Sequence, residues 1–295
     1  MRRRPPRGNH RTRQRINSAL KTISGGLGYG AFVEPAFLEM TLVDITIPDL
    51  PPAMDGYRIA HLTDIHYNFT AGRNFLQRVV EKTNALDPDL VALTGDFITH
   101  APHNLHRCMA LLSDLRAPDG CWVTRGNHDY KVPLAEFREA CRDAGFRLLE
   151  NQHAVVRPSR HRTGRSADAV HDPQVGFVLA GVGDLWEGIC LPGRALDGAD
   201  PGRPTVLLSH NPQAANLLVP SQRVDLMLSG HTHGGQIRPG GRSLKIFADG
   251  SATYVAGLVS TQLTKVYISR GVGTSAFRFR WNCRPEIALV RLHCG

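Results

Sequence analysis

The sequence lacks any run of 18 apolar residues, so a helix that spans a lipid bilayer is not expected. Residues 22–33 are apolar and follow a basic region, as in a signal sequence. They are rich in glycine, run into Glu34 and Pro35, and have no A-x-A cleavage site. We therefore expect a cytoplasmic location, either free or peripheral to the inner face of the cytoplasmic membrane.

Cysteine pairs of the CxxC type are also absent among the six cysteines, which argues against a zinc or redox motif. Four of the six lie in or beside apolar segments, so we expect free thiols and no disulfide framework. A content of 42% hydrophobic and 21% charged residues is ordinary for a folded globular protein. The length of 295 residues suits one large domain with an extension.

Acidic residues are missing before Glu34, whereas eight arginines and lysines precede it. Apolar residues recur at helical spacing there: Ile16, Leu20, Ile23 and Leu27. The pattern is typical of a basic amphipathic helix on an anionic membrane, and the alternative is a solvated, disordered tail. The tail has no interleaved aromatics, so nucleic acid is not the expected partner. We divide the chain into an extension over 1–33 and a domain over 34–295.

Short apolar runs alternate with helical stripes beyond Asp55, which predicts α/β layering. The expected strands are 58–62, 90–93, 121–123, 175–182, 205–208, 225–228, 265–268 and 286–292, and the expected helices cover 75–86, 105–115 and 133–144. The polar segment 157–173 and the Gly/Pro-rich segment 192–204 are expected to be surface loops. We expect the second loop, which directly precedes a strand, to shape a substrate pocket.

Metal-binding types of side chain follow five of these apolar runs. They are Asp64 with His66, Asp96, Asn127 with His128 and Asp129, His210, and His231 with His233. Side chains just past the carboxyl ends of strands converge on one crevice of an α/β sheet, so distant segments can build one site. Asp64 and His66 point the same way if their segment is extended, and the same holds for His231 and His233.

Aspartate, histidine and asparagine without a thiolate suit two divalent ions, with Mn²⁺ first and Fe²⁺, Zn²⁺ or Co²⁺ as alternatives. Two ions about 3.5 to 4 Å apart clamp a phosphoryl group and activate a shared water. Any one of these histidines alone would be read as structural, whereas the ordered set favours a metal centre. The other nine histidines are read as structural, with His100 and His103 as candidates for supporting the ligands.

Five motifs, D-x-H, G-D, G-N-H-D, H and G-H-T-H, occur in this order between Asp64 and His233. In this the chain resembles the calcineurin-like metallophosphoesterase superfamily. The resemblance implies a four-layer αββα sandwich of two mixed β-sheets flanked by helices. It also implies two groups of metal ligands that share Asp96: the first is Asp64, His66, Asp96 and His233, and the second is Asp96, Asn127, His210 and His231.

The same resemblance implies how these residues act. A hydroxide that bridges the two ions would attack phosphorus, so no covalent intermediate is expected. His128 would give a proton to the leaving oxygen, a role that suits an imidazole near neutral pH, and Asp129 would orient His128.

Shorter motifs at 34–39 (E-P-x-x-L-E), 269–274 (S-R-G-V-G-T) and 284–287 (R-P-E-I) resemble those of YkuE- and YaeI-like bacterial phosphodiesterases and of LpxG-type UDP-2,3-diacylglucosamine pyrophosphatases. They imply an enzyme that cleaves a phosphodiester or pyrophosphate bond, and a nucleotide-linked lipid of lipid A biosynthesis is the most specific substrate that they suggest. We expect the protein to be a monomer. The alternatives are a phosphodiesterase or phosphatase of soluble or cell-wall substrates, a non-catalytic scaffold, and a nuclease.

One motif near the C-terminus has two readings of equal weight. Arginines alternate there with aromatic residues: Phe277, Arg278, Phe279, Arg280 and Trp281, followed by Arg284. The arginines either extend along a strand edge to reach solvent or form an anion- or lipid-facing wall of the pocket.

Overall fold

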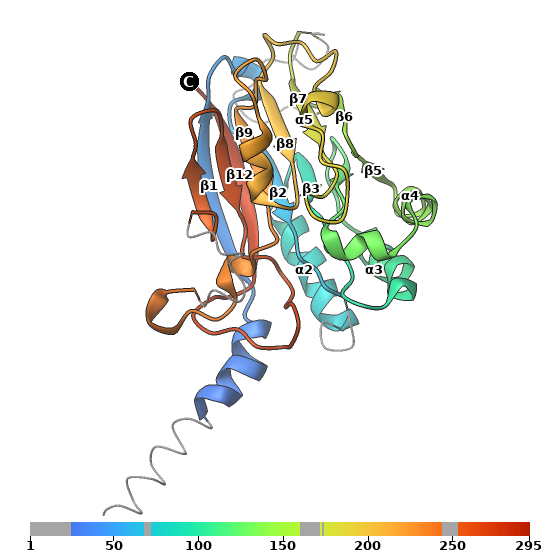
Figure 1. The fold of residues 1–295 in the computed structure, drawn as a ribbon, viewed down its shortest axis with the longest axis vertical. Coiled ribbons are helices and arrows are strands. Elements are labelled where there is room, and N and C mark those ends of the chain that lie inside the picture. The colour runs from blue at the N-terminus through green and yellow to red at the C-terminus, as the bar shows by residue number, and fades with distance from the viewer. Residues whose placement is uncertain (1–24, 68–71, 160–171, 173, 244–252) are drawn as a thin grey trace, which may run out of the picture.

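Two mixed β-sheets form the centre of the molecule in the computed structural model, which describes residues 25–67, 72–159, 172, 174–243 and 253–295 (Figure 1). The first sheet has the strand order β1 (Glu39–Ile47), β12 (Glu286–Cys294), β2 (Tyr57–Leu62), β3 (Leu90–Leu93), β4 (Cys121–Val123) and β5 (Phe146–Leu148). The second has the order β10 (Gly257–Ser260), β11 (Lys265–Ile268), β9 (Leu226–Ser229), β8 (Thr205–Leu208), β7 (Phe177–Gly181) and β6 (Gln152–Val156). In each sheet, a run of parallel strands ends at the same edge.

Helices cover the outer faces of both sheets, as the four-layer prediction requires. Three amphipathic helices pack on the first sheet: α2 (Arg73–Ala85), α3 (Leu105–Leu112) and α4 (Leu134–Asp143). The described layer on the second sheet is thinner and contains α5 (Pro192–Ala195) and the 3-10 helix η7 (Pro212–Leu217). The predicted α/β class and the pair of mixed sheets with helices are confirmed.

Three apolar clusters separate these layers. One lies between the first sheet and its helices, one between the two sheets, and one beneath the short helices of the second sheet. Side chains of the central strands β3 and β8 are fully buried, so both strands are fixed from both faces. This burial matters for function because the loops that follow these strands then start from fixed points.

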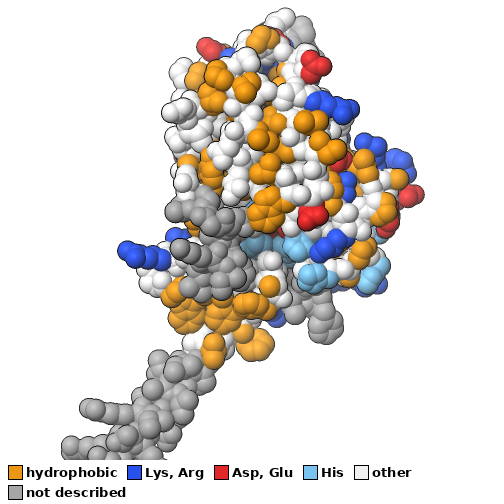
Figure 2. Space-filling view, viewed as in Figure 1, with side chains coloured by type: hydrophobic (Ala, Val, Ile, Leu, Met, Phe, Trp, Pro, Cys, Tyr) orange, Lys and Arg blue, Asp and Glu red, His pale blue; other side chains and the backbone are white. Residues whose placement is uncertain are grey.

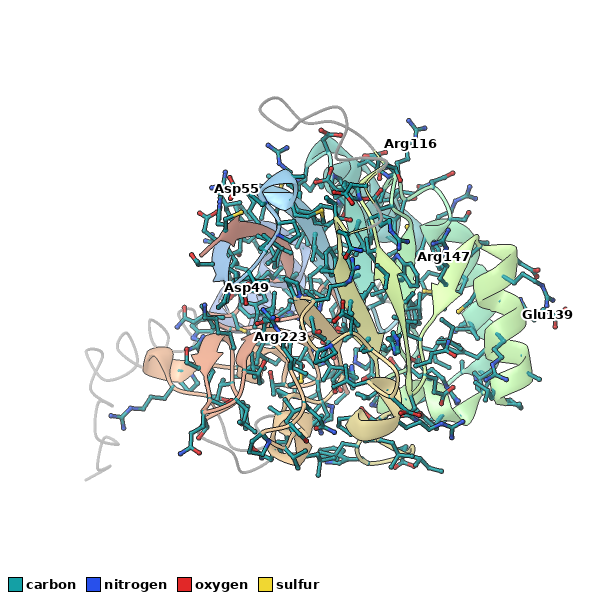
Figure 3. All side chains as sticks on the ribbon, turned by 90° about the horizontal axis from the view of Figure 1, so that it is seen from above. Asp49, Asp55, Arg116, Glu139, Arg147 and Arg223 are labelled. Carbon is teal, nitrogen blue, oxygen red and sulfur yellow. The ribbon has the colours of Figure 1, made fainter. Side chains whose placement is uncertain are left out.

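The two sheets are tied together at the end seen in Figure 3. The guanidinium of Arg223 donates to the carbonyl oxygen of Pro48 at 2.8 Å and lies 3.3 Å from the carboxylate of Asp49. Arg223 precedes β9, and Pro48 and Asp49 follow β1, so one side chain joins both sheets. The parallel strands of both sheets begin toward this end, and their carboxyl ends lie at the opposite end.

The segment that precedes β1 packs against the C-terminal aromatic motif. Residues 25–28 are α-helical, and η1 (Tyr29–Val33) continues them as a π-helical turn. A Cβ atom at Gly30 would lie 2.5 Å from the Phe279 ring, and one at Gly26 would lie 3.1 Å from the Trp281 ring. Glycine at these positions therefore allows the helical turns to approach two stacked rings. The greater part of the predicted amphipathic helix lies outside the described residues.

Arg280 corrects part of the reading of that motif. Its side chain is fully buried and donates to the carbonyl oxygens of Gly273 at 2.6 Å, Arg270 at 2.8 Å and Gly271 at 3.0 Å. This arginine therefore holds the 270–273 turn together and reaches neither solvent nor a substrate. Arg284, by contrast, is exposed, with its guanidinium 4.3 Å from the centre of the Phe37 ring.

All six cysteines are free, as expected, and four of them are buried. Among the described residues, no helix has both the length and the apolar character that crossing a membrane requires.

Candidate metal centre

The candidate ligands lie on tight turns that follow the strands, and most of them have a left-handed backbone. The φ angles are +53° at Asp64, +47° at His66, +56° at Asp96, +72° at His231 and +51° at His233. The expectation that each D-x-H and H-x-H pair is extended is therefore wrong, because the side chains converge through sharp turns instead. A non-glycine residue in this region costs about 1 to 3 kcal/mol, and such strain is typical of functional sites.

Four of the candidate ligands form a first group around the end of β2. His66 Nε2 lies 3.0 Å from His233 Nε2, 3.4 Å from Asp96 Oδ2 and 4.0 Å from Asp64 Oδ1. His233 Nε2 lies 3.2 Å from Asp64 Oδ1. All four side chains are buried, so their donor atoms face one another in a small volume.

The other group contains Asp96, Asn127, His210 and His231. His210 Nε2 lies 3.3 Å from Asp96 Oδ2 and 3.2 Å from His231 Nδ1. His231 Nδ1 is also 3.1 Å from Asn127 Oδ1. The Oδ2 atom of Asp96 therefore lies between the two groups, within 3.4 Å of one imidazole from each.

The donor sets fit divalent ions, and at His66 and His210 the nitrogen that faces away from the site is already engaged. His210 Nδ1 lies 2.7 Å from the carbonyl oxygen of Thr94, which can only accept, so Nδ1 carries a hydrogen and Nε2 is the nitrogen that faces the other donor atoms. His66 Nδ1 lies 3.1 Å from the Thr99 hydroxyl. Hydrogen bonds of this kind orient metal-binding histidines and fix their tautomers. The chemistry and the convergence of these side chains both suit a pair of ions.

Charge and burial act against each other at this site. Burial would raise the pKa of Asp96, but the imidazoles of His210 and His66 outweigh it and hold that pKa below its usual range. Burial would lower the pKa of His210, whereas the carboxylate of Asp96 raises it well above its usual value. Burial prevails at His66, where it lowers the pKa to about 3. Without metal ions, Asp96 and His210 thus form an ion pair, and His66 is neutral.

His128 lies beside the first group, and hydrogen bonds hold its ring on the side that faces away from that group. Its Nδ1 donates to the carbonyl oxygen of Thr99 at 2.8 Å, and its backbone N–H donates to Asp96 Oδ1 at 2.9 Å. The Lys131 ammonium donates to the same Thr99 oxygen at 2.7 Å and lies 3.0 Å from His128 Nδ1. The Nε2 atom of His128 is therefore the nitrogen left for chemistry.

Asp129 has different partners from those that the sequence suggested. Its fully buried carboxylate accepts the backbone N–H groups of Asp96 at 2.8 Å, Phe97 at 2.9 Å and Gly126 at 2.9 Å. These bonds hold the loop after β3 against the loop after β4. Among the described residues, no hydrogen bond joins this carboxylate to the His128 ring, which the Thr99 carbonyl orients instead.

Of the two other histidines proposed to support the site, His100 is near it and His103 is apart. The His100 ring centre lies 6.0 Å from that of His128, and its Nδ1 is 3.4 Å from the Lys131 ammonium. His103 is exposed on the 3-10 helix η4 (Pro102–Asn104) and has no hydrogen bond to the described site residues.

Trp186 is a neighbour of the site that the sequence reasoning missed. Its ring stands edge-to-face to that of His231, with 4.3 Å between the ring centres. It follows β7 by a few residues, just as the candidate ligands follow their strands, so the strand-end rule could have found it. The 192–204 loop, in contrast, enters the amino end of β8, opposite the end that leads to His210, so its expected part in the pocket is wrong.

The family model of the calcineurin-like phosphoesterases matches residues 57–235, which include every candidate ligand. The chain belongs to this family. Within the calcineurin-like phosphoesterases, it is 34% identical to the zebrafish (Danio rerio) "Transmembrane protein with metallophosphoesterase domain", over 85% of this chain and 57% of that protein.

Two bacterial calcineurin-like phosphoesterases match along most of their own length. The phosphodiesterase YaeI of Escherichia coli is 30% identical over 91% of this chain and 93% of its own. The UDP-2,3-diacylglucosamine pyrophosphatase LpxG of Chlamydia muridarum is 26% identical over 88% of this chain and 90% of its own. The chain thus spans little more than half of the zebrafish relative and nearly all of the bacterial ones.

Proposed function

We propose that the chain is a dinuclear metal-dependent phosphoesterase that hydrolyses a phosphodiester or pyrophosphate bond. The observation that carries this proposal is the pair of donor groups that meet at Asp96. Seven side chains from five strand ends take part: Asp64, His66, Asp96, Asn127, His210, His231 and His233. Asp96 would bridge two ions, one held with Asp64, His66 and His233 and the other with Asn127, His210 and His231.

The ions would be Mn²⁺, with Fe²⁺, Zn²⁺ or Co²⁺ able to occupy the same oxygen and nitrogen ligands. Two such ions, when bound, neutralise phosphate charge and lower the pKa of a bound water. The protein holds the ligands on strained turns, and contacts at the Nδ1 atoms of His66 and His210 orient these two rings. Asp129 positions the turn of Asp96 through the backbone and does not touch substrate.

His128 is the proposed proton donor to the leaving oxygen. Its Nδ1–H is bonded to the Thr99 carbonyl, so the ring is oriented and Nε2 delivers the proton. The ammonium of Lys131, 3.0 Å from Nδ1, adds positive charge beside a group that faces a phosphate. A positioned histidine contributes about 100- to 10,000-fold to such a step.

A nucleotide-linked lipid such as UDP-2,3-diacylglucosamine is the proposed substrate. The support is the sequence similarity to an LpxG pyrophosphatase over 90% of that protein's length. YaeI, which carries the name phosphodiesterase, supports a wider substrate class at a similar level of identity. A phosphodiesterase of soluble or cell-wall substrates is therefore the second candidate function.

The test uses purified protein loaded with Mn²⁺, bis-nitrophenyl phosphate and UDP-2,3-diacylglucosamine. We expect cleavage of both compounds, with UMP released from the second. A His128→Asn variant, which keeps all seven ligands, should bind the same amount of metal and lose at least about 100-fold in kcat. Cleavage of the nitrophenyl ester without UMP release would leave the second candidate function. Equal, negligible turnover by both proteins would leave a non-catalytic scaffold.

We also propose that this enzyme binds an anionic membrane surface through its N-terminal segment. Large apolar side chains gather at the base of the N-terminal helical turns, beside a group of histidines (Figure 2). Four large apolar side chains of the N-terminal segment and of the C-terminal aromatic motif are more than half exposed: Leu27 at 57%, Phe32 at 70%, Phe37 at 52% and Phe277 at 53%. These exposed apolar side chains, together with the eight cations that the sequence contains before Glu34, suit a lipid interface.

Vesicle sedimentation tests this partner. The full chain should bind vesicles that contain phosphatidylglycerol, and binding should weaken at high salt because the cations are screened. Phe32→Ser should reduce binding severalfold. Val155→Ser, at an exposed site on the edge strand β6, should leave binding unchanged. Equal binding by the two variants, or binding to neutral vesicles alone, would contradict the proposal.

A further inference from the structure

The loop between β7 and α5 exposes three apolar side chains, one of them against the candidate ligand His231, although its backbone is firmly held. Trp186 is 50% exposed, Ile189 is 70% exposed and Leu191 is 41% exposed. Single exposed apolar residues are common on protein surfaces. Three of them within six residues, beside a candidate ligand, indicate a binding surface.

Hydrogen bonds inside the loop fix the place of Trp186. The carboxylate oxygen Oδ1 of Asp184 accepts the backbone N–H groups of Trp186 at 2.8 Å and Glu187 at 3.0 Å. Asp184 is itself buried, at 1% exposure, and its N–H donates to the Tyr130 hydroxyl at 3.1 Å. The turn that carries Trp186 is thus tied to the G-N-H-D segment, which provides Asn127 and His128.

A second set of contacts closes the loop on its far side. Asn151 donates through Nδ2 to the carbonyl oxygen of Ile189 at 2.7 Å and accepts the Leu191 N–H at 2.9 Å. Gly188 lies so close to the Tyr130 ring that a Cβ atom there would overlap it. The Tyr130 ring in turn stacks under the guanidinium of Arg125 at 3.7 Å. The exposed indole is therefore presented by a rigid frame.

We infer that Trp186 is a stacking platform for a planar ring of the substrate, of the nucleobase or aryl class. The inference rests on the proposed function, because it places the phosphate of that ring's ester at the metal centre. The indole ring lies 4.3 Å from the His231 ring, so a base that is joined to phosphate through a pentose reaches it. Every nucleobase offers a flat π face, and an aromatic side chain binds that face with little sequence preference.

Binding of three phosphate monoesters distinguishes ring stacking on Trp186 from binding of the phosphate alone and from binding of an apolar chain. All three compounds carry the same phosphate group. UMP adds a planar base through its ribose, methyl phosphate adds only a methyl group, and octyl phosphate adds a flexible alkyl chain. Their dissociation constants are measured by calorimetry with Mn²⁺-loaded wild type, Trp186→Phe and Trp186→Leu. Leucine keeps the apolar surface but removes the flat ring, whereas phenylalanine keeps both.

The wild type should bind UMP more tightly than methyl phosphate. Trp186→Leu should weaken UMP binding by about 5- to 150-fold and leave methyl phosphate unchanged, and Trp186→Phe should restore most of the loss. An unchanged UMP to methyl phosphate ratio in Trp186→Leu would overturn the inference. So would an equal loss of both ligands, or octyl phosphate binding as tightly as UMP. Failure of the wild type to bind any of the three would remove the proposed function itself.

Discussion

The Nε2 atoms of His66 and His233 lie 3.0 Å apart, although 167 residues separate them in the chain. Two imidazole nitrogens at this distance share at most one hydrogen atom, whereas one divalent ion accepts both lone pairs. His66 is buried and neutral because burial lowers its pKa to about 3. The pair is therefore in the protonation state that a metal ion requires.

Removing one member of this pair should remove one ion. We expect His233→Ala to reduce bound metal from about two ions to about one and to lower kcat/KM by more than about 100-fold. Loss of a residue that only hydrogen-bonds to a ligand costs about 10- to 100-fold, so a larger loss indicates a direct ligand. Metal content is measured by mass spectrometry and activity with bis-nitrophenyl phosphate. His103→Ala, at an exposed histidine, is the matched control and should behave as wild type. Two ions in His233→Ala would disprove the assignment.

Metal binding should release a proton from His210. Its pKa is raised well above the usual value because the attraction of Asp96 outweighs burial. The metal-free protein therefore holds this proton at neutral pH and must lose it before Nε2 can bind an ion. Affinity for Mn²⁺ should rise with pH. Calorimetry at pH 7 in two buffers of different ionisation enthalpy measures the release, and His210→Asn should release about one proton fewer. Equal heats in both buffers would contradict this assignment.

His61 should make the fold sensitive to acid. This residue lies within β2, fully buried, and burial lowers its pKa to about 4, against about 6.5 for an exposed imidazole. The unfolded chain takes up the proton first, so the stabilisation is complete above about pH 6.5 and is lost as the pH falls toward 4. The loss amounts to about 3 kcal/mol.

Urea unfolding in the presence of a chelator measures this effect. His61→Gln should be less stable than wild type at pH 7 because it disturbs the contact with Thr94. Its free energy of unfolding should fall less between pH 7 and pH 5 than that of wild type. Parallel falls in the two proteins would show that His61 does not contribute.

Asp129→Asn separates two roles for the last residue of G-N-H-D. The carboxylate accepts three backbone N–H groups, which an amide cannot all satisfy. We expect a loss of about 1 to 3 kcal/mol in stability and about 10- to 100-fold weaker metal binding. The pH profile of kcat at saturating metal should stay unchanged. A shifted profile with intact metal affinity would favour orientation of His128 instead.

Local patterns were enough to predict most of the fold. The buried runs 90–93, 121–123, 205–208 and 265–268 are strands with the predicted bounds, and the three predicted helices are present. Four strands were missed: β1, β5, β6 and β10. β5 has only three residues. The strands β1, β6 and β10 mix exposed side chains with partly buried ones, so none of these strands forms a continuous apolar run.

The site was predictable in composition but not in geometry. Residue types and strand ends identified the side chains that meet, because the ends of parallel strands converge. The left-handed turns at Asp64 and His231 depend on packing between distant loops, such as Gly230 against the Thr63 side chain. The partners of Asp129 are backbone groups, which carry no signal in side-chain identity. Trp186 could have been noticed from its place after β7, but a single tryptophan does not belong to any metal-ligand motif, so the motif search did not find it.

The position of β12 has a consequence for how the protein is made. This strand lies between β1 and β2, and it pairs Glu286 with Glu39, 247 positions earlier (Figure 1). A ribosome that adds about 5 to 20 residues per second needs about 12 to 50 seconds to reach it. Throughout that time β1 has no neighbour in its sheet. The nascent chain thus carries an unpaired strand until its last residues emerge, and an unpaired strand edge favours aggregation during synthesis.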